Sequence, residues 1–243
     1  MPAPKLRPRP ALKTSRFGVI AEIKNRSPAE GPLAGRDADR AARAERYAAA
    51  GAAAISVLTE PDRFDGHLDH LAEVVEAVPG TPVMRKDFLV DTVQVVEAHA
   101  VGARGVLLIT AMLDDRQQHA MLDCAWNHDL FVLLEAFSED DIERAQALLD
   151  SVVHKAKAEH GELLFGVNSR NLRTLEVDPT RLERYAPLLP AGVPVAESGL
   201  RSARDAARVA AKGYRLALVG TALMRADDPG ALIREMTASA ENA

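Results

Sequence analysis

Short apolar runs alternate along the chain with longer amphipathic segments, beginning near Phe17. The runs are rich in Val, Ile and Leu and do not alternate strictly with polar residues, which is typical of parallel strands that are buried on both faces. They predict strands at residues 18–23, 53–58, 82–85, 105–109, 130–135, 163–167, 193–196 and 216–219.

The amphipathic segments between these runs predict helices. We expect them at residues 37–50, 67–78, 91–101, 114–128, 139 to about 160, 178–188 and 202–212. Several begin with a residue type that favours the N-cap position, namely Asp37, Asp91, Asp114, Ser138, Asp178 and Ser202. Glycines stand where three of them would end, at Gly51, Gly102 and Gly213.

Eight βα units without a break in composition favour the α/β class and a single closed (β/α)8 TIM barrel. The length of 243 residues is also usual for such a barrel. The alternative is a doubly wound open sheet, which usually has fewer strands and a glycine-rich first turn. Here the turn after the first expected strand reads Lys24-Asn25-Arg26-Ser27-Pro28 and contains no glycine.

The first 16 residues differ from the rest of the chain. They hold four prolines, no acidic residue and the basic residues Lys5, Arg7, Arg9, Lys13 and Arg16. We therefore expect residues 1–16 to form an irregular basic arm and residues 17–243 to form the barrel domain.

Composition and charge narrow the class of protein. The net charge of −5 and the pI of about 5.8 argue against nucleic acid as a main partner. Cys124 is the only cysteine, so no intrachain disulfide can form, and we expect a cytoplasmic location. The sequence lacks an apolar run long enough for a membrane helix and the apolar core of a signal peptide, which predicts a soluble protein without a membrane partner.

Charged and polar residues gather at the ends of the expected strands. The first ends in Glu22 and Lys24, the third in Arg85-Lys86-Asp87, the fifth at Glu135, the sixth in Asn168-Ser169-Arg170-Asn171 and the seventh in Glu197-Ser198-Gly199. Active sites of barrels lie at the C-terminal ends of their strands, where such side chains can face a polar cavity. The alternative for any single strand end is a local ion pair or helix cap at the rim.

The last two strand ends indicate a phosphate site. Ser198-Gly199 follows the seventh expected strand, and Gly220-Thr221 follows the eighth. Small residues before a helix allow an anion to approach the backbone N–H groups, and barrels commonly bind phosphate after strands seven and eight. The alternative is a pair of ordinary turns.

Other candidates for chemistry are weaker. His67 and His70 lie three residues apart without a matched third metal ligand, so we interpret them as part of a surface helix. Cys124 lies within an expected amphipathic helix with no nearby basic partner and is interpreted as a small core residue. The sequence shows no nucleophile elbow, Walker loop or dinucleotide fingerprint, and we expect neither a cofactor nor a metal.

Taken together, the strand ends resemble the indole-3-glycerol phosphate synthase family, from about Val19 to the C-terminus. The most specific stretches are residues 20–24 with Ser27-Pro28, residues 56–60, residues 85–88, residues 168–172 and residues 197–199. The resemblance implies tryptophan biosynthesis. The reaction would be ring closure of 1-(2-carboxyphenylamino)-1-deoxyribulose 5-phosphate, with loss of carbon dioxide and water.

The resemblance also implies roles for the site residues. Lys86 is the general acid of ring closure, Lys24 is a second ammonium near the substrate carboxylate and the leaving hydroxyl, and Glu135 is the base of the dehydration. Glu22 and Glu197 orient the lysines and stabilise charge on the developing ring. The sequence does not assign which of Lys24 and Glu135 transfers which proton.

The resemblance implies substrate-binding residues as well. Asn168 and Arg170 hold the anthranilate moiety and the sugar hydroxyls, and Asn168 is also one of the implied catalytic residues. The phosphate end is lined by Ser27, Ser198, Gly199, Gly220 and Thr221.

Three departures from the family pattern affect what we expect. The family carries a longer helical segment before the first strand, part of which covers the site, so the basic arm here predicts a more open mouth. The fifth strand reads Leu133-Leu134-Glu135-Ala136-Phe137 where the family often has Glu-Val-His. Residues 151–160 extend a helix and form an insertion that we expect at the N-terminal face of the barrel.

Two other functions remain open at this point. A phosphoribosylanthranilate isomerase or another phosphosugar barrel would share the phosphate end, but would normally use a cysteine and an aspartate at strand ends. A barrel that has lost catalysis could instead serve as a binding or regulatory subunit. For the favoured function we expect a phosphorylated small-molecule substrate and a monomer, with other enzymes of tryptophan biosynthesis as candidate partners.

Overall fold

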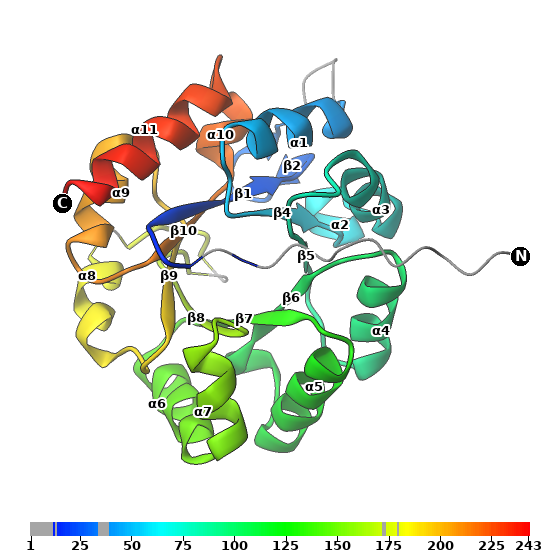
Figure 1. The fold of residues 1–243 in the computed structure, drawn as a ribbon, viewed down its shortest axis with the longest axis vertical. Coiled ribbons are helices and arrows are strands. Elements are labelled where there is room, and N and C mark those ends of the chain that lie inside the picture. The colour runs from blue at the N-terminus through cyan, green and yellow to red at the C-terminus, as the bar shows by residue number, and fades with distance from the viewer. Residues whose placement is uncertain (1–11, 13, 34–38, 172–173, 179) are drawn as a thin grey trace, which may run out of the picture.

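A computed structural model describes residues 12, 14–33, 39–171, 174–178 and 180–243 of the chain. Eight parallel strands close into a barrel in the order β1-β10-β9-β8-β7-β6-β5-β4. Their bounds are β1 (Gly18–Ile23), β4 (Ala54–Leu58), β5 (Val83–Lys86), β6 (Gly105–Ile109), β7 (Phe131–Ala136), β8 (Leu163–Asn168), β9 (Val193–Glu197) and β10 (Leu216–Val219). Figure 1 shows the helices in a ring around these strands, so the predicted TIM barrel is confirmed.

Helices follow the strands on the outside of the barrel (Figure 1). They are α1 (Arg40–Ala49), α2 (Pro61–Phe64), α3 (Leu68–Ala77), α4 (Thr92–Ala100), α5 (Asp115–Asn127), α6 (Glu139–Ala147), α7 (Val152–Glu159), α8 (Arg181–Tyr185), α9 (Ala203–Ala210), α10 (Thr221–Arg225) and α11 (Pro229–Glu241). Three short 3-10 turns are η1 (Thr110–Met112), η2 (Leu148–Asp150) and η3 (Ala186–Leu188), and a small hairpin pairs β2 (Arg26–Ser27) with β3 (Gly31–Pro32).

Most of the predicted helix caps are confirmed. Asp91, Asp114, Ser138 and Ser202 each form a capping box with the residue three positions later. The prediction for Asp178 was wrong, because α8 begins after Thr180. Asp178 instead accepts a hydrogen bond from the Thr180 backbone N–H at 3.0 Å, before the helix begins.

The cap of α1 lies close to the predicted residue. Asp37 lies outside the described residues, and Asp39 caps α1 by accepting from the Ala42 backbone N–H. Gly51, Gly102 and Gly213 take φ values of 87°, 94° and 94°, the left-handed conformation expected at helix ends.

The single helix predicted over residues 139 to about 160 was wrong. The segment consists of α6, η2 and α7, and Ser151 between them has extended backbone angles of φ −78° and ψ 124°. The buried Leu148 keeps the 3-10 turn against the core, while Val152 and Val153 begin α7 at the surface. Polar residues on both sides of the break continue the amphipathic pattern, so periodicity alone does not predict the break.

Alternation along the strands produces two buried layers. One set of side chains packs outward against the helices, and the other fills the interior of the barrel. The interior set includes Ile20, Met84, Leu107, Leu133, Leu164 and Leu216. Towards the C-terminal ends of the strands these apolar residues give way to the buried side chains of Glu22, Glu135 and Glu197. The interior is therefore packed at one end and charged at the other.

The described end of the basic arm lies at the N-terminal face of the barrel. Leu12 packs against the interior cluster, and the Thr14 carbonyl accepts from Arg215 Nη2 at 2.8 Å, directly before β10. This face is opposite the C-terminal strand ends, so this part of the arm does not approach the expected site. Residues 1–11 and 13 lie outside the described residues.

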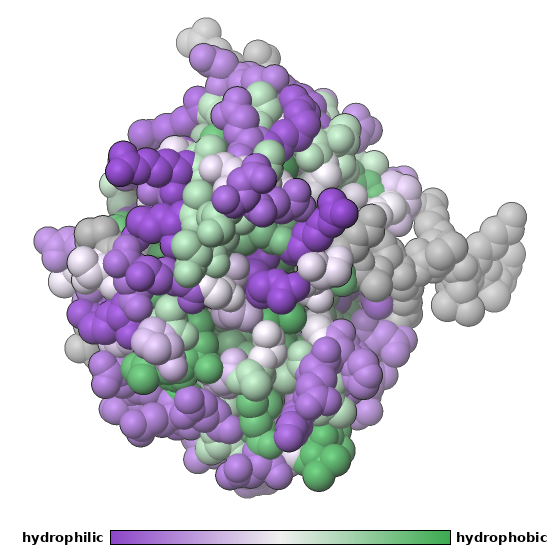
Figure 2. Space-filling model, turned by 60° about the vertical axis from the view of Figure 1, so that its left-hand side comes forward, coloured by the Kyte–Doolittle hydropathy of each residue, from purple (hydrophilic) through white to green (hydrophobic). Residues whose placement is uncertain are grey.

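The surface is predominantly polar on the face seen in Figure 2, with hydrophobic residues in smaller areas between hydrophilic ones. Among the described residues, no helix combines the length and the apolar character needed to cross a membrane.

Candidate active site

A pocket opens at the C-terminal ends of the strands and encloses about 1070 Å³, counting its open mouth. All of the site residues that the sequence predicts line this one pocket: Glu22, Lys24, Ser27, Lys86, Glu135, Asn168, Arg170, Glu197, Ser198, Gly199, Gly220 and Thr221. They come from six separate segments of the chain, at the ends of β1, β5, β7, β8, β9 and β10, and closure of the barrel is what brings them together.

Glu22 and Lys24 form a close ion pair at one side of the pocket. Lys24 Nζ lies 2.5 Å from Glu22 Oε1, and both side chains are largely buried. Burial opposes ionisation of the Glu22 carboxyl, but the positive charges of Lys24, Lys86 and Arg170 lower its pKa below the usual range. Glu22 is therefore held as a carboxylate.

Gly220 leaves the space that this ion pair occupies. A Cβ atom on Gly220 would overlap Glu22 Oε1 and would lie 2.9 Å from Lys24 Nζ. The absence of a side chain at this position thus serves the Glu22–Lys24 pair, in addition to opening the loop after β10.

Lys86 ends β5 and faces three acidic side chains. Burial disfavours its positive charge, yet the carboxylates of Glu135, Glu197 and Glu22 raise its pKa above the ordinary value of a lysine. The ammonium is thus kept protonated inside the pocket, where it can donate a proton to an oxygen that acquires negative charge.

Glu135 is fixed by a neighbour on the next strand. Asn168 Nδ2 donates to Glu135 Oε1 at 2.5 Å, and Asn168 Oδ1 accepts from the Arg170 backbone N–H at 2.9 Å. Arg170 Nη1 in turn donates to the carbonyl of Leu175 at 2.7 Å. This chain of hydrogen bonds links Arg170 and Leu175 to the end of β8, and the Asn168 bond sets the direction of the Glu135 carboxyl.

Glu197 is the least compensated carboxyl of the pocket. Both of its oxygens are buried without a hydrogen-bond partner among the described residues. Burial and the nearby Glu135 and Glu22 raise the Glu197 pKa well above its usual range, against the opposing effect of Lys86. Its side chain lies over Gly166, where a Cβ atom would overlap Glu197 Oε1.

The part of the pocket next to the Glu22–Lys24 pair, after β9 and β10, is built from backbone and small residues. Ser198 and Gly199 take left-handed φ values of 66° and 77° after β9. Gly220 is the N-cap of α10, and no side chain of the described residues donates or accepts a capping hydrogen bond in its first turn, which begins at Thr221. Such N–H groups suit an anion.

The β2–β3 hairpin lies beside this end of the pocket. Ser27, in β2, is buried and lines the pocket. Glu30, between the two strands, pairs with Arg225 of α10 at 3.0 Å. The ion pair ties the hairpin to the helix that follows Gly220.

An apolar wall completes the pocket, and the sequence alone did not identify it. Leu58, Phe64, Phe88, Leu107 and Ile109 line this side. The Phe64 and Phe88 ring centroids lie 6.5 Å apart. A planar aromatic group would fit against such a surface.

The α2 helix places Phe64 in that wall. The Glu60 carboxylate accepts from the backbone N–H groups of Asp62, Arg63 and Phe64 and so caps this short helix. The sequence signal was available, since Glu60 precedes a proline at the first helical position, but so short a helix carries no periodicity.

The remaining sequence candidates lie away from the pocket. His67 caps α3, its ring nitrogen accepting from the Asp69 backbone N–H, as suits the surface helix expected for it. Cys124 is partly buried against the core, and burial raises the pKa of its thiol. The prediction that Cys124 has no nearby basic partner was wrong in one respect. His128, one helical turn later, places its Nδ1 4.0 Å from the Cys124 Sγ.

A family model and individual relatives of this chain point to the same family. The model of the family described as indole-3-glycerol phosphate synthase matches residues 5–236. A protein of that name from a Nocardioides species is 46% identical over 231 residues, covering 95% of this chain and 84% of the relative. Another from a Parafrankia species is 45% identical, covering 93% of this chain and 79% of the relative.

Solved structures share the fold at low sequence identity. A 3-hexulose-6-phosphate synthase from Salmonella typhimurium superimposes with a TM-score of 0.70 at 15% identity, covering 93% of this chain and 99% of that chain. Thiamine phosphate pyrophosphorylase from Pyrococcus furiosus gives a TM-score of 0.62 at 16% identity, covering 93% of this chain and 96% of that chain. At this identity the likeness concerns the barrel architecture only.

Proposed function

Because the chain belongs to the indole-3-glycerol phosphate synthase family, we propose that it closes the indole ring of 1-(2-carboxyphenylamino)-1-deoxyribulose 5-phosphate in tryptophan biosynthesis. The products are indole-3-glycerol phosphate, carbon dioxide and water. One observation carries this proposal: a protonated lysine, Lys86, shares one pocket with three acidic side chains, an apolar wall and a glycine-rich end.

In the proposed first step, Lys86 acts as the general acid. A carbon of the anthranilate ring attacks the ribulose carbonyl, a carbon–carbon bond forms, and the carbonyl oxygen takes the proton of Lys86. The apolar wall around Phe88 binds the anthranilate ring. Glu22 and Glu197 offset the positive charge that the ring gains during the attack.

Decarboxylation and dehydration then restore aromaticity. The ring carboxylate leaves as carbon dioxide, and the C–C bond electrons return to the ring. Glu135 removes a proton and the former carbonyl oxygen departs as water, with Lys24 as the ammonium near the leaving hydroxyl. Asn168 supports this assignment because it orients the Glu135 carboxyl at 2.5 Å. Arg170, at the edge of the pocket, binds the substrate carboxylate or sugar hydroxyls.

We place the substrate phosphate at the end lined by Ser27, Ser198, Gly199, Gly220 and Thr221. Support comes from the uncapped first turn of α10 and from the two left-handed residues after β9. The cytoplasmic location and the monomeric state stay predictions.

The direct test is the fluorescence of the indole product after the carboxyphenylamino substrate is added to the purified protein. The proposal expects product from the wild type, and competitive inhibition by inorganic phosphate. Absence of product under conditions where a characterised family member turns over would contradict it. Inhibition by phosphate that does not depend on substrate concentration would show that the phosphate end is misplaced.

A further inference from the structure

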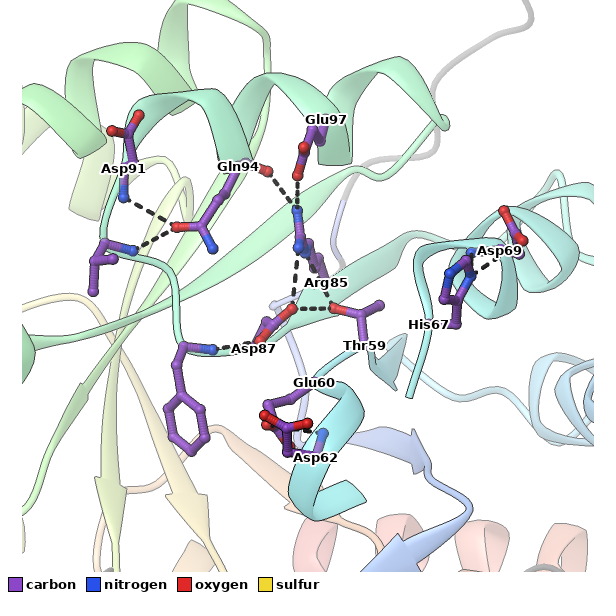
Figure 3. A network of polar contacts seen from close by, with 12 residues as sticks. Thr59, Glu60, Asp62, His67, Asp69, Arg85, Asp87, Asp91, Gln94 and Glu97 are labelled. Atoms are coloured by element: carbon purple, nitrogen blue, oxygen red, sulfur yellow. Dashed lines mark hydrogen bonds and ion pairs between the residues drawn. The ribbon is translucent and has the colours of Figure 1, made fainter. Parts of the chain in front are cut away.

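A buried polar cluster formed by Thr59, Arg85 and Asp87 lies at the C-terminal end of β5, and Figure 3 shows it below α4. Arg85 Nε donates to Thr59 Oγ1 at 3.1 Å, and Arg85 Nη2 pairs with Asp87 Oδ2 at 3.0 Å. Thr59 Oγ1 donates to the same Asp87 oxygen at 2.6 Å. The three side chains thus form a closed triangle, and the Arg85 and Asp87 side chains are only 8% and 10% exposed.

This cluster brackets Lys86 along the chain. Arg85 precedes it and Asp87 follows it, while the Thr59 backbone N–H donates to the Lys86 carbonyl at 3.1 Å. Thr59 therefore binds the Lys86 segment twice, through its backbone to Lys86 itself and through its hydroxyl to both flanking residues. Successive side chains of a strand point to opposite faces, so Arg85 turns outward while Lys86 faces the pocket.

Further contacts join the cluster to rigid surroundings. On the outer side, Arg85 Nη1 donates to the Gln94 carbonyl at 2.8 Å and to Glu97 Oε2 at 3.0 Å, both on α4. On the pocket side, Asp87 Oδ1 accepts from the Phe88 backbone N–H at 2.8 Å. The cluster consequently fixes the backbone of the proposed acid and the start of the apolar wall as one unit.

We propose that Thr59, Arg85 and Asp87 are positioning residues that hold Lys86 at the height where its ammonium meets the substrate carbonyl. The inference rests on the proposed function, in which Lys86 is the acid. A lysine side chain has four rotatable bonds, and the Lys86 ammonium faces three acidic side chains at once. Only a fixed backbone selects one position among them, and a displacement of about 1 Å can lower a rate about 100-fold.

Thr59 is the residue best suited to a test, because it is buried and does not line the pocket. Thr59→Val keeps the size of the side chain and removes the hydroxyl, whereas Thr59→Ser keeps the hydroxyl. Tyr214→Phe is a matched control, because it removes one buried hydroxyl that donates to the Leu182 carbonyl at 2.9 Å, away from the pocket.

The deciding measurement is the rate at which an acylating reagent modifies Lys86, followed by mass spectrometry of the folded protein. If Lys86 moves away from the acidic side chains, it becomes more exposed and its pKa falls, so a larger fraction is in the reactive neutral form. We therefore expect Lys86 to be labelled at least about threefold faster in Thr59→Val. Thr59→Ser and Tyr214→Phe should label at the wild-type rate. In turnover, Thr59→Val should lower kcat about tenfold with KM changed less than about twofold.

An unchanged labelling rate of Lys86 in Thr59→Val overturns the positioning role, whatever happens to kcat. Equal acceleration in Tyr214→Phe also overturns it, because general loosening of the barrel would then explain the effect. If the wild type forms no indole product, the proposed function fails, while the labelling rates still decide the positioning role.

Discussion

At the scale of single residues, the pocket places the Lys86 ammonium among the acidic side chains of Glu22, Glu135 and Glu197. Lys86→Met keeps the apolar stem of the side chain and removes the proton donor, so we expect kcat to fall by about 10² to 10⁴. Substrate affinity should change little, because the phosphate end and the apolar wall are left intact. Steady-state kinetics with Lys212→Met, an exposed lysine after α9, as control will check this. Near wild-type kcat in Lys86→Met would exclude Lys86 as the acid.

Gly220 offers a second test at this scale. A methyl group there would overlap the Glu22 carboxylate, so we expect Gly220→Ala to displace the Glu22–Lys24 pair and to lower kcat/KM at least about tenfold. Gly80→Ala is the control, because a Cβ atom at Gly80 would have no neighbour within 4 Å in the part of the chain that the structure describes. Equal activity in the two variants would show that the pair tolerates displacement.

The charged residues of the pocket could be predicted from the sequence, and its apolar residues could not. Glu22, Lys86 and Glu135 stand out because a barrel interior seldom holds ionised groups. Leu107 and Ile109 line the same pocket, but they look like any other interior residue of a barrel strand. The sequence therefore predicted the charged residues that the pocket gathers, and the apolar wall was found only in the three-dimensional structure.

At the scale of elements, the strands were easier to predict than the helices. β1, β6 and β10 begin and end at the predicted residues, because burial on both faces gives each a short, uninterrupted apolar run. The helix predicted over 139 to about 160 failed because the break at Ser151 depends on backbone angles rather than on the polarity pattern. The hairpin β2–β3, with two residues in each strand, is too short to produce a pattern at all.

Helix caps give a prediction at this scale. The Asp91 side chain accepts from the Val93 backbone N–H at 2.9 Å, and the Gln94 side chain returns a bond to the Asp91 backbone. We expect Asp91→Ala to lower the free energy of unfolding by about 1 kcal/mol in urea denaturation. Asp114→Ala, which removes the equivalent box of α5, should give a similar loss. A loss of less than a few tenths of a kcal/mol in both would contradict this.

At the scale of the whole molecule, the pocket carries a stability cost that depends on pH. The pKa of Glu197 is raised in the folded state, so the folded protein binds this proton more tightly than the unfolded chain does. The contribution of Glu197 to stability therefore falls as the pH rises above the ordinary value of 4.5. A neutral side chain at this position should remove that penalty.

We accordingly expect Glu197→Gln to unfold at a higher temperature than the wild type at pH 7 to 8, and to lose this advantage as the pH approaches 4.5. Its catalytic rate should fall over the same neutral range. Thermal unfolding followed by circular dichroism across pH will measure the difference, with the exposed Glu143→Gln as control. A variant that is less stable than the wild type at every pH would contradict this. It would indicate that the attraction between Lys86 and a charged Glu197 stabilises the fold by more than the burial of that charge destabilises it.

The pairing of β1 with β10 joins the first strand of the barrel to the last, in register from Gly18 and Leu216 to Ala21 and Val219. During synthesis on the ribosome, β1 is made early, and the edge that pairs with β10 stays unpaired until β10 is made near the end of translation. Until then the unpaired N–H and C=O groups of β1 can pair with another chain. Truncation before Leu216 should thus yield aggregates rather than a smaller folded unit, and chaperone demand should end only when the last strand is released.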